Sequence, residues 1–544
     1  MPVNLSVDNL IKRFDTIKSN RYQWETHWQD CADYCLPQKA IITKIRTPGT
    51  KLKTDIYDST AIQSAQIFAA GLHSYLTNPS SKWFSLKMKE RALMADTNVK
   101  DWLKASEDII FDHLNDSNFN DVINEDYVDF GIFGNSVLYE EEDPEDVITF
   151  AVRPISEIYF LANHRGRIDT IYRDFTFTAR QAFQRWGNNA GQKVLDLISS
   201  GKVEEKLSFL HIVLPRDERD VKKKNAVNMP FASLYIEPTT RKILSEGGYE
   251  EFPFFVGRAY KVSDSEYAYA PASLAIADVK TVNKMDGDIL EAAEKTLHPA
   301  VILPHDGYLL PFKTSARAIN YKISGSPDER VETLRIEREI GISLEMENQR
   351  RATIQRAFFV DLFLMLASLP EKQRTATEIA ERVNERMLIL GPMLGRLMHE
   401  KLDPIITRTF NILGRNFKLP PMPPQLKDKN YKVEYISPLA KAQRASEVKS
   451  ISDLIFAVGQ MAAINQTVTD CVDFDKALKR ISEVTNTGEI IQSDDDVKAI
   501  RESRSQRQEM QATIDALQRG GPGVKALADA DTALKKGENP NAGK

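Results

Sequence analysis

Three groups of side chains have residue types and spacings that could perform chemistry. The first is His27-x3-Cys31-x3-Cys35, which would place three possible metal ligands on one face of a helix. The other two are carboxylate runs, Glu140-Glu141-Glu142-Asp143 and Asp494-Asp495-Asp496, whose oxygens suit divalent cations. Metal binding is therefore the chemistry to weigh first.

Ordinary structural roles explain these groups better than metal binding does. Cys31 and Cys35 lie on an apolar stripe within residues 6–35, and no other Cys or His cluster completes a zinc shell. The carboxylate runs suit a solvated turn and a helix start. We therefore expect buried cysteines and predict neither a metal nor a cofactor.

Sequence signatures of catalysis are missing. The chain has no GxxxxGK[ST] phosphate loop, no GxGxxG between strand and helix, and no HExxH, and its eight histidines are scattered. An enzyme of this size usually carries at least one such signature, so catalysis is disfavoured.

Length and composition set further limits. A chain of 544 residues exceeds what one hydrophobic core usually fills. With 42% hydrophobic and 27% charged residues, wholesale disorder is excluded. The net charge of −5 disfavours a protein that grips nucleic acid over its whole surface, but it permits one that lets nucleic acid pass.

No membrane segment is expected. The most apolar run, 357–369, falls short of the ~20 residues that a spanning helix needs. The N-terminus lacks the apolar core of a secretion signal. Three cysteines are too few for a disulfide scaffold, which suits synthesis in a reducing cytosol.

The first half of the chain reads as mixed α+β. Hydrophobic periodicity predicts helices over 6–35, 59–77, about 97–116, 119–133 and near 178–200. Strands are predicted in SVLYEEE, VITFAV, EIYFLA and DTIYRDFTF, and again at 207–215, 231–237 and 253–261.

The second half is predominantly helical. Two long helices, 272–297 and 343–366, flank a proline-rich extended segment. A charged loop, SLPEKQR, separates the second helix from a capping box, Thr375-Ala376-Thr377-Glu378. The helix that follows is expected to reach about Leu413, with kinks at Gly391-Pro392 and Pro404. A strand YKVEYI, a helical set over 440–519 and a polar disordered tail complete the prediction.

In this order of elements the chain resembles a phage portal protein, and more narrowly the head-to-tail connectors of short-tailed, T7-like phages. The similarity is carried by AAGLHSYLTNPSSKWFSL (69–86), DFGIFGNSVLYEEE (129–142), GRAYKVSDSEYAYAPASLAIADVKTVNKM (257–285) and FFVDLFLMLASLPEKQRTATEIAERVNERM (358–387). It is collinear over about residues 6–440.

The resemblance implies a structural, ring-forming protein rather than an enzyme. Such portals are rings, typically of twelve copies, at the portal vertex of the virion, and this chain would be made in the host cytoplasm. Double-stranded DNA would pass non-specifically through the channel, and a terminase motor and then a tail adaptor protein would dock. Major capsid and scaffolding proteins, and internal core proteins at the crown, are further implied partners.

By the same resemblance the chain divides into named parts. They are an α+β wing (1–263), a first stem helix (264–299), a β-containing clip (300–342), a second stem helix (343–366), a tunnel loop (367–374), a second wing part (375–440), a helical crown (441–519) and a disordered tail (520–544).

Three sets of site residues follow from this division. Pro370, Glu371, Lys372, Gln373 and Arg374 would line the narrowest part of the channel. Arg350, Arg351 and Arg356 on the second stem helix would face DNA or, as paired surface charge more commonly does, form ion pairs with Glu345, Glu347 and neighbouring subunits. Tyr308, Leu309, Leu310 and Phe312 would form a subunit or adaptor interface of the clip.

Two other functional interpretations are compatible with the sequence. One is a different oligomeric virion component, such as a tail-tube or adaptor-type connector. The other is a DNA-processing enzyme with carboxylate-held metal. Without the resemblance, 367–374 would be taken as an ordinary helix–helix connection.

Overall fold

The computed structural model of the chain describes residues 6–519 except for 46, 48, 51–54, 91–92, 95, 224, 264, 299–300, 303–320, 322–331, 334–339, 368–388, 427–430, 437, 463–470 and 486–493. The chain forms two compact units, Met1–Gln443 and Arg444–Lys544. Each unit has its own architecture.

The first unit begins with helices whose bounds agree closely with the sequence prediction. They are α1 (Val7–Cys35), α2 (Thr60–Leu76), α3 (Thr97–Asp116) and α4 (Phe119–Phe133). Helix α4 ends at Gly134, whose φ of 70° terminates the helix in the left-handed conformation that glycine adopts without strain. A Cβ there would lie 2.4 Å from the backbone of Tyr269, so close packing also requires glycine.

Strand β1 (Phe84–Met88) lies between α2 and α3. Two antiparallel sheets follow α4. Their strands are β2 (Asn135–Asp143), β3 (Val147–Val152), β4 (Ile158–Ala162), β5 (Ile168–Thr178), β6 (Lys206–Pro215), β7 (Phe231–Glu237), β8 (Lys242–Tyr249) and β9 (Phe254–Arg258). One sheet has the order β3-β2-β9, and the other is a meander β4-β5-β6-β7-β8. A short pair, β10 (Tyr260–Lys261) with β11 (Ala268–Tyr269), precedes the next helix.

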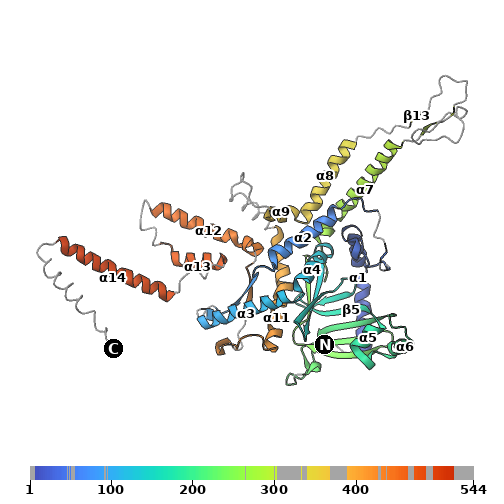
Figure 1. The fold of residues 1–544 in the computed structure, drawn as a ribbon, viewed down its shortest axis with the longest axis horizontal. Coiled ribbons are helices and arrows are strands. Elements are labelled where there is room, and N and C mark those ends of the chain that lie inside the picture. The colour runs from blue at the N-terminus through green and yellow to red at the C-terminus, as the bar shows by residue number, and fades with distance from the viewer. Residues whose placement is uncertain are drawn as a thin grey trace, which may run out of the picture. The chain divides into compact units, whose positions relative to one another are not determined.

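Alternation along the meander separates two small cores. Leu10, Phe14 and Ile17 of α1 cluster with Tyr172 and other residues on one face of the sheet. On alternate positions, Phe175 and Phe209 cluster with Trp186 of α5 (Ala179–Trp186). Helix α6 (Gln192–Ser199) contributes Val194 to this second cluster. The sheet is therefore covered by α1 on one face and by α5–α6 on the other (Figure 1).

The main core joins residues from both ends of the first unit. Three helices come first: α7 (Pro271–Leu297), α8 (Ile340–Ala357) and α9 (Val360–Ala367). A helical stretch over 389–397 then continues without interruption as a π-helix (Met398–Leu402) and as α11 (Asp403–Arg415). Leu390, Leu394 and Leu397 are fully buried and belong to the same hydrophobic cluster as residues of α2, α4 and β2. Strand β14 (Tyr431–Tyr435) then pairs antiparallel with β1, with Phe84 opposite Tyr435.

Prediction and structure differ along the second long helix. Residues 343–366 were predicted as one helix, whereas the structure has α8 and α9 with a turn at Phe358–Phe359. Phe359 has a φ of 56°, an unfavourable conformation for an aromatic residue. The turn allows Phe358 and Phe363 both to be buried on the ring of Phe68, and tertiary packing thus overrides local helix propensity.

Smaller corrections have local causes. The helix predicted near 178–200 is two helices, because Gly187 and Gly191 between them have φ values of 54° and 93°. Strand β8 was not predicted. The kink predicted at Pro404 takes the form of the π-helix immediately before it, since proline lacks the N–H for a regular helical hydrogen bond. Residues 389–397 are helical through Gly391-Pro392.

The second unit contains helices, as predicted. They are α12 (Pro438–Ala462, which begins in the first unit), α13 (Phe474–Thr485) and α14 (Asp494–Arg519). The carboxylate run Asp494–Asp496 thus forms the start of α14. Within the described part of the chain, no helix is long and apolar enough to cross a bilayer.

Candidate functional site

Helices α7 and α8 lie side by side and flank the segment that was predicted as a clip (Figure 1). The chain leaves α7 into β12 (Val301–Ile302) and returns through β13 (Glu332–Thr333), and these two short strands pair antiparallel. The two helices that the sequence predicted as stem helices are therefore packed against each other within one chain.

Arg351 connects the two helices through carboxylates. Its guanidinium lies 2.9 Å from Asp286 of α7 and 3.2 Å from Asp58, and it also pairs with Glu347 one turn away on α8. The side chains of Asp58 and Glu347 are only 7% and 2% exposed, so the cation neutralises carboxylates that water barely reaches. The predicted Glu347 pairing is thus present, although Arg351 has two further partners within the chain.

The other two predicted arginines differ from Arg351. Arg350 forms an ion pair with Asp278 of α7. Arg356 is exposed, and it has no ion pair with any described residue. Of the three arginines, Arg356 alone has no acidic partner in the part of the chain that the structure describes.

The remaining predicted site residues lie outside the described residues. This holds for the tunnel-loop set, Pro370, Glu371, Lys372, Gln373 and Arg374, and for the clip set, Tyr308, Leu309, Leu310 and Phe312. Their predicted roles stay predictions.

The His27-Cys31-Cys35 group packs as the sequence analysis expected. Cys31 and Cys35 are completely buried in the main core, and His27 Nε2 lies 2.8 Å from the Ser273 hydroxyl. Burial raises the pKa of the Cys31 thiol to about 12, so the thiolate that would ligate a metal is disfavoured. Among the described residues, no group of three or more His, Cys, Asp or Glu side chains is arranged to hold a metal ion.

The carboxylates of residues 140–143 are dispersed rather than convergent. Glu140 is fully buried, Glu141 lies 3.7 Å from Arg185, and Glu142 lies 2.8 Å from Arg415. Asp143 accepts hydrogen bonds from the backbone N–H groups of the turn that follows. The expected solvated turn is therefore found only at Asp143; Glu140 is instead buried within β2, because a buried strand and not a loop carries this part of the run.

A buried ionic contact fastens the π-helix to the core. Lys401 Nζ donates to both carboxylate oxygens of Asp126 in α4, at 2.7 and 2.5 Å, and to the Ser136 hydroxyl in β2 at 2.5 Å. The side chains of Lys401 and Asp126 are 0% exposed. Burial lowers the pKa of Lys401, and the facing Asp126 opposes that effect.

A second buried contact lies two turns further along the same helix. The Thr409 hydroxyl donates to Glu140 Oε1 at 2.9 Å, and Arg408 Nε lies 3.8 Å from Glu140 Oε2. Burial raises the pKa of Glu140 to about 8, although Arg408 acts in the opposite direction. Burial therefore favours the protonated form of this carboxyl group more than water does, whereas Arg408 favours the charged form.

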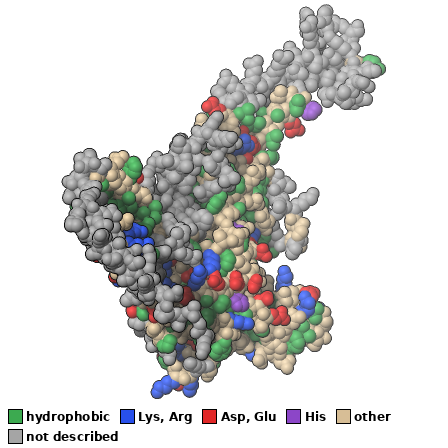
Figure 2. Space-filling view, turned by 60° about the vertical axis from the view of Figure 1, so that its left-hand side comes forward, with side chains coloured by type: hydrophobic (Ala, Val, Ile, Leu, Met, Phe, Trp, Pro, Cys, Tyr) green, Lys and Arg blue, Asp and Glu red, His purple; other side chains and the backbone are tan. Residues whose placement is uncertain are grey.

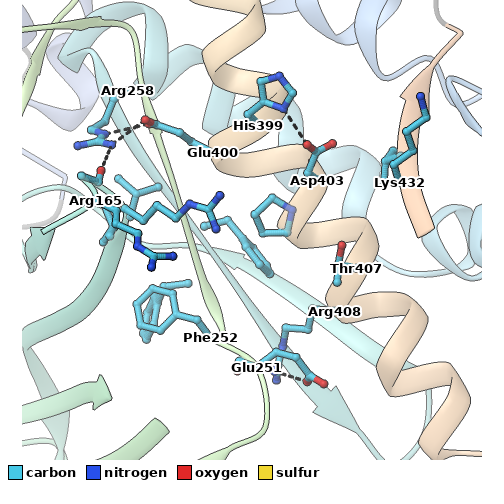
Figure 3. Close-up of a pocket in the computed structure, with 18 of the residues that line it drawn as sticks. Arg165, Glu251, Phe252, Arg258, His399, Glu400, Asp403, Thr407, Arg408 and Lys432 are labelled. Carbon is cyan, nitrogen blue, oxygen red and sulfur yellow. Dashed lines mark hydrogen bonds and ion pairs between the residues drawn. The ribbon is translucent and has the colours of Figure 1, made fainter. Parts of the chain in front are cut away.

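A third contact lies at the edge of this helix and is visible in Figure 3. Arg258 at the end of β9 forms a bidentate pair with Glu400, with N–O distances of 2.9 and 2.6 Å. Its guanidinium also donates to the carbonyl of Gly166 at 2.8 Å. The contacts of Lys401, Arg408 and Arg258 together are called the ionic seam below.

The ionic seam was not predicted, although the sequence contains a signal for it. Lys401 and Arg408 are seven residues apart, which is two helical turns, and they interrupt the apolar positions Leu397, Leu402 and Ile405. A basic residue on the apolar face of a helix usually has a buried acidic partner. The identity of that partner depends on the fold.

On one face of the molecule, charged side chains of both signs are mixed. On the face shown in Figure 2, Lys and Arg are interspersed with Asp and Glu rather than gathered into one basic surface. This distribution agrees with the net charge of −5 and does not suit tight, extended binding of nucleic acid.

Comparison with known proteins decides the family. Residues 7–489 match the family described as bacteriophage head to tail connecting protein. This chain belongs to that family. Members are structural components of the virion and not enzymes, so the predicted absence of catalysis is confirmed at the level of the family.

Two curated relatives of this connector match over nearly their whole length. The portal protein of Salmonella phage epsilon15 is 29% identical over 537 residues, 97% of this chain and 96% of the relative. The probable portal protein of Bordetella phage BPP-1 is 28% identical over 530 residues, covering 96% of each. A chain from the virion of a native gene transfer agent has a TM-score of 0.34 and 12% identity, covering 74% of this chain and 86% of that one, a similarity too low to argue from.

Proposed function

We propose that this connector assembles as a ring at one vertex of the capsid, with double-stranded DNA passing through its central channel during packaging and ejection. The observation that carries the proposal is the packing of α7 against α8 around an inserted β segment, in a chain of the head-to-tail connecting family. Relatives named portal proteins, matched over almost their full length, support the same role.

The paired helices would line the channel as its stem. A translocation channel must not hold DNA tightly, because each phosphate neutralised by a basic side chain adds affinity and therefore drag. Two of the three arginines on α8, Arg350 and Arg351, already face carboxylates of their own chain. Of these arginines, only Arg356 would be available to a duplex, which favours passage over retention.

The division into parts is proposed on the same basis. Residues 1–263 and 375–440 would form the wing, and the shared core of the first unit together with the β1–β14 pair supports joining these two segments. Residues 441–519 would form the crown, and the boundary between the compact units after Gln443 supports a separate part there. Residues 300–342 would form the clip, and 367–374 the tunnel loop.

The proposed partners follow from this placement. A terminase motor and later a tail adaptor would bind the clip end, capsid and scaffolding proteins would contact the wing, and internal core proteins would meet the crown. Of the predicted clip set, Tyr308 and Phe312 carry the most apolar surface for such contacts. Replacing both by serine is expected to impair ring closure or adaptor docking, which co-sedimentation with the adaptor would measure; unchanged assembly and docking would contradict this role.

Imaging the purified chain tests the function directly. Negative-stain images and native mass spectrometry should show a closed ring with a central hole wide enough for duplex DNA. A particle that remains a monomer under assembly conditions, or a compact oligomer without a hole, would overturn the proposal. A complementation assay with capsids that lack the connector would then measure whether DNA enters the head.

A further inference from the structure

A groove of about 860 Å³ lies beside the ionic seam, bordered by the β4–β5 turn, β9, the π-helix with α11, and β14 (Figure 3). Its floor is largely apolar, with aromatic and aliphatic side chains from β9, from the residues that lead into it, and from β14. They include Phe252, Phe254, Val256, Tyr431 and Val433. This volume falls within the ~300–1,000 Å³ that binding pockets commonly have.

The carboxylates of the groove all have partners. Glu400 pairs with Arg258, and Glu251 pairs with Arg408 and with Arg415. Asp403 accepts hydrogen bonds from the Tyr435 hydroxyl at 2.6 Å and from His399 Nδ1 at 2.9 Å. Glu400 and Glu251 are therefore already neutralised by arginines, and Asp403 is the one carboxylate among the described lining residues whose partners are a hydroxyl and an imidazole.

Four basic side chains at the rim have no such partner. Lys89, Arg165, Arg167 and Lys432 are exposed, line the groove and form no ion pair with any residue that the structure describes. They come from three segments that are far apart in the sequence, and the groove concentrates them around one apolar floor. The result is a local excess of positive charge in a chain whose net charge is −5.

We propose that this groove binds an acidic segment of a partner protein, a segment that carries an apolar side chain among its carboxylates. The apolar side chain would fill the floor beside Phe252 and Tyr431, and the carboxylates would meet the rim cations. This arrangement, an apolar centre with a charged rim, is the one that protein interfaces use. The groove contact is additional to the ring and channel functions and would hold even if the ring model failed.

Nucleic acid is the less suitable occupant. A phosphate backbone is bound by a row of basic and hydrogen-bonding groups that follows the strand, and it gains nothing from aliphatic side chains such as Val256 and Val433. The basic residues of the groove instead come from three separate segments and share its lining with apolar side chains. An acidic peptide and a nucleic acid therefore require different binding surfaces, and an experiment can distinguish them.

The test uses the full-length chain and a short fluorescein-labelled peptide of Asp and Glu residues around a central Phe-Leu pair. Fluorescence anisotropy should show saturable binding that weakens with added salt. The Arg165→Glu, Arg167→Glu double variant should bind about tenfold or more weakly, because two attractive contacts become repulsive. A matched control, Lys193→Glu with Lys202→Glu, reverses two exposed lysines outside the groove and should bind as the wild type does.

Two further probes decide the class of ligand. A peptide with Ser-Ser in place of Phe-Leu should bind more weakly, and a random-sequence DNA duplex should not compete. Absence of peptide binding, equal binding by both double variants, equal binding of the Ser-Ser peptide, or competition by the duplex would each overturn the proposal. Loss of ring assembly in the Arg165→Glu, Arg167→Glu variant but not in the control would assign the groove to a second copy of this chain instead.

Discussion

Replacing Lys401 by methionine is expected to destabilise the first unit by about 3–5 kcal/mol, the cost typical of breaking a fully buried ion pair. Methionine keeps the length and most of the volume of the lysine side chain, so the loss is electrostatic rather than steric. Asp126, which is 0% exposed, would keep only the hydrogen bond from Ser136, at 3.0 Å. A buried carboxylate with a single neutral donor is poorly compensated.

A double-mutant cycle would show that the pair, and not methionine itself, causes this loss. Asp126→Asn removes the charge that Lys401 neutralises, so the Lys401→Met, Asp126→Asn double variant should recover much of the stability lost in Lys401→Met alone. We expect a coupling free energy of about 2–3 kcal/mol, near the upper end for residues in direct contact.

The assay is urea unfolding followed by tryptophan fluorescence at one fixed protein concentration, because oligomerisation would otherwise add to the apparent stability. Trp28 and Trp83 are buried in the main core and would report its loss. Lys193→Met, at an exposed position of α6, is the control and should change stability by no more than about 0.5 kcal/mol. A loss below about 1 kcal/mol for Lys401→Met, with an unchanged spectrum, would refute the reasoning.

Three other perturbations have clear expected results. The pKa of Glu140 is raised from 4.5 to about 8, so between those pH values the folded chain holds a proton that the unfolded chain releases, and the stability should fall as the pH rises. In the Glu140→Gln variant, the urea midpoint should depend less on pH. An unchanged pH dependence in that variant would contradict this assignment. Arg351→Ala leaves three carboxylates, two of them nearly buried, without their shared cation. The free energy of unfolding should fall by about 2–4 kcal/mol in the same assay. An unchanged stability would mean that the contact between α7 and α8 does not depend on Arg351. Lys372→Glu with Arg374→Glu would make the proposed tunnel loop acidic and repel DNA; rings should form normally while packaged DNA falls, and a normal DNA yield would argue against a channel position.

Helix periodicity allowed the helical part of the fold to be predicted well. The bounds of α3 and α4 were obtained from sequence, because their apolar stripes are regular and capping residues mark their ends. Strand β8 was missed because KILSEGGY combines two glycines with charged residues and has weak alternation. The break at Phe358–Phe359 was missed because its cause is the ring of Phe68, in a helix that is distant in sequence.

The functional site was harder to predict from the sequence than the fold was. The arginines of α8 were found because they lie on a predicted helix, but their partners Asp278 and Asp286 belong to another helix and become neighbours only through packing. The groove could not be predicted, since Lys89, Arg165 and Lys432 meet only when the chain has folded.

The pairing of β1 with β14 has a consequence for how the protein is made. A ribosome releases Phe84–Met88 early, but the partner strand Tyr431–Tyr435 emerges only after the intervening helices and strands have been synthesised. Closing so long a loop is entropically costly and slow, so the first unit cannot complete its structure during most of translation. Truncated chains that end before Tyr431 should therefore lack the finished wing and be removed by proteases, which would keep incomplete subunits from being built into new capsids.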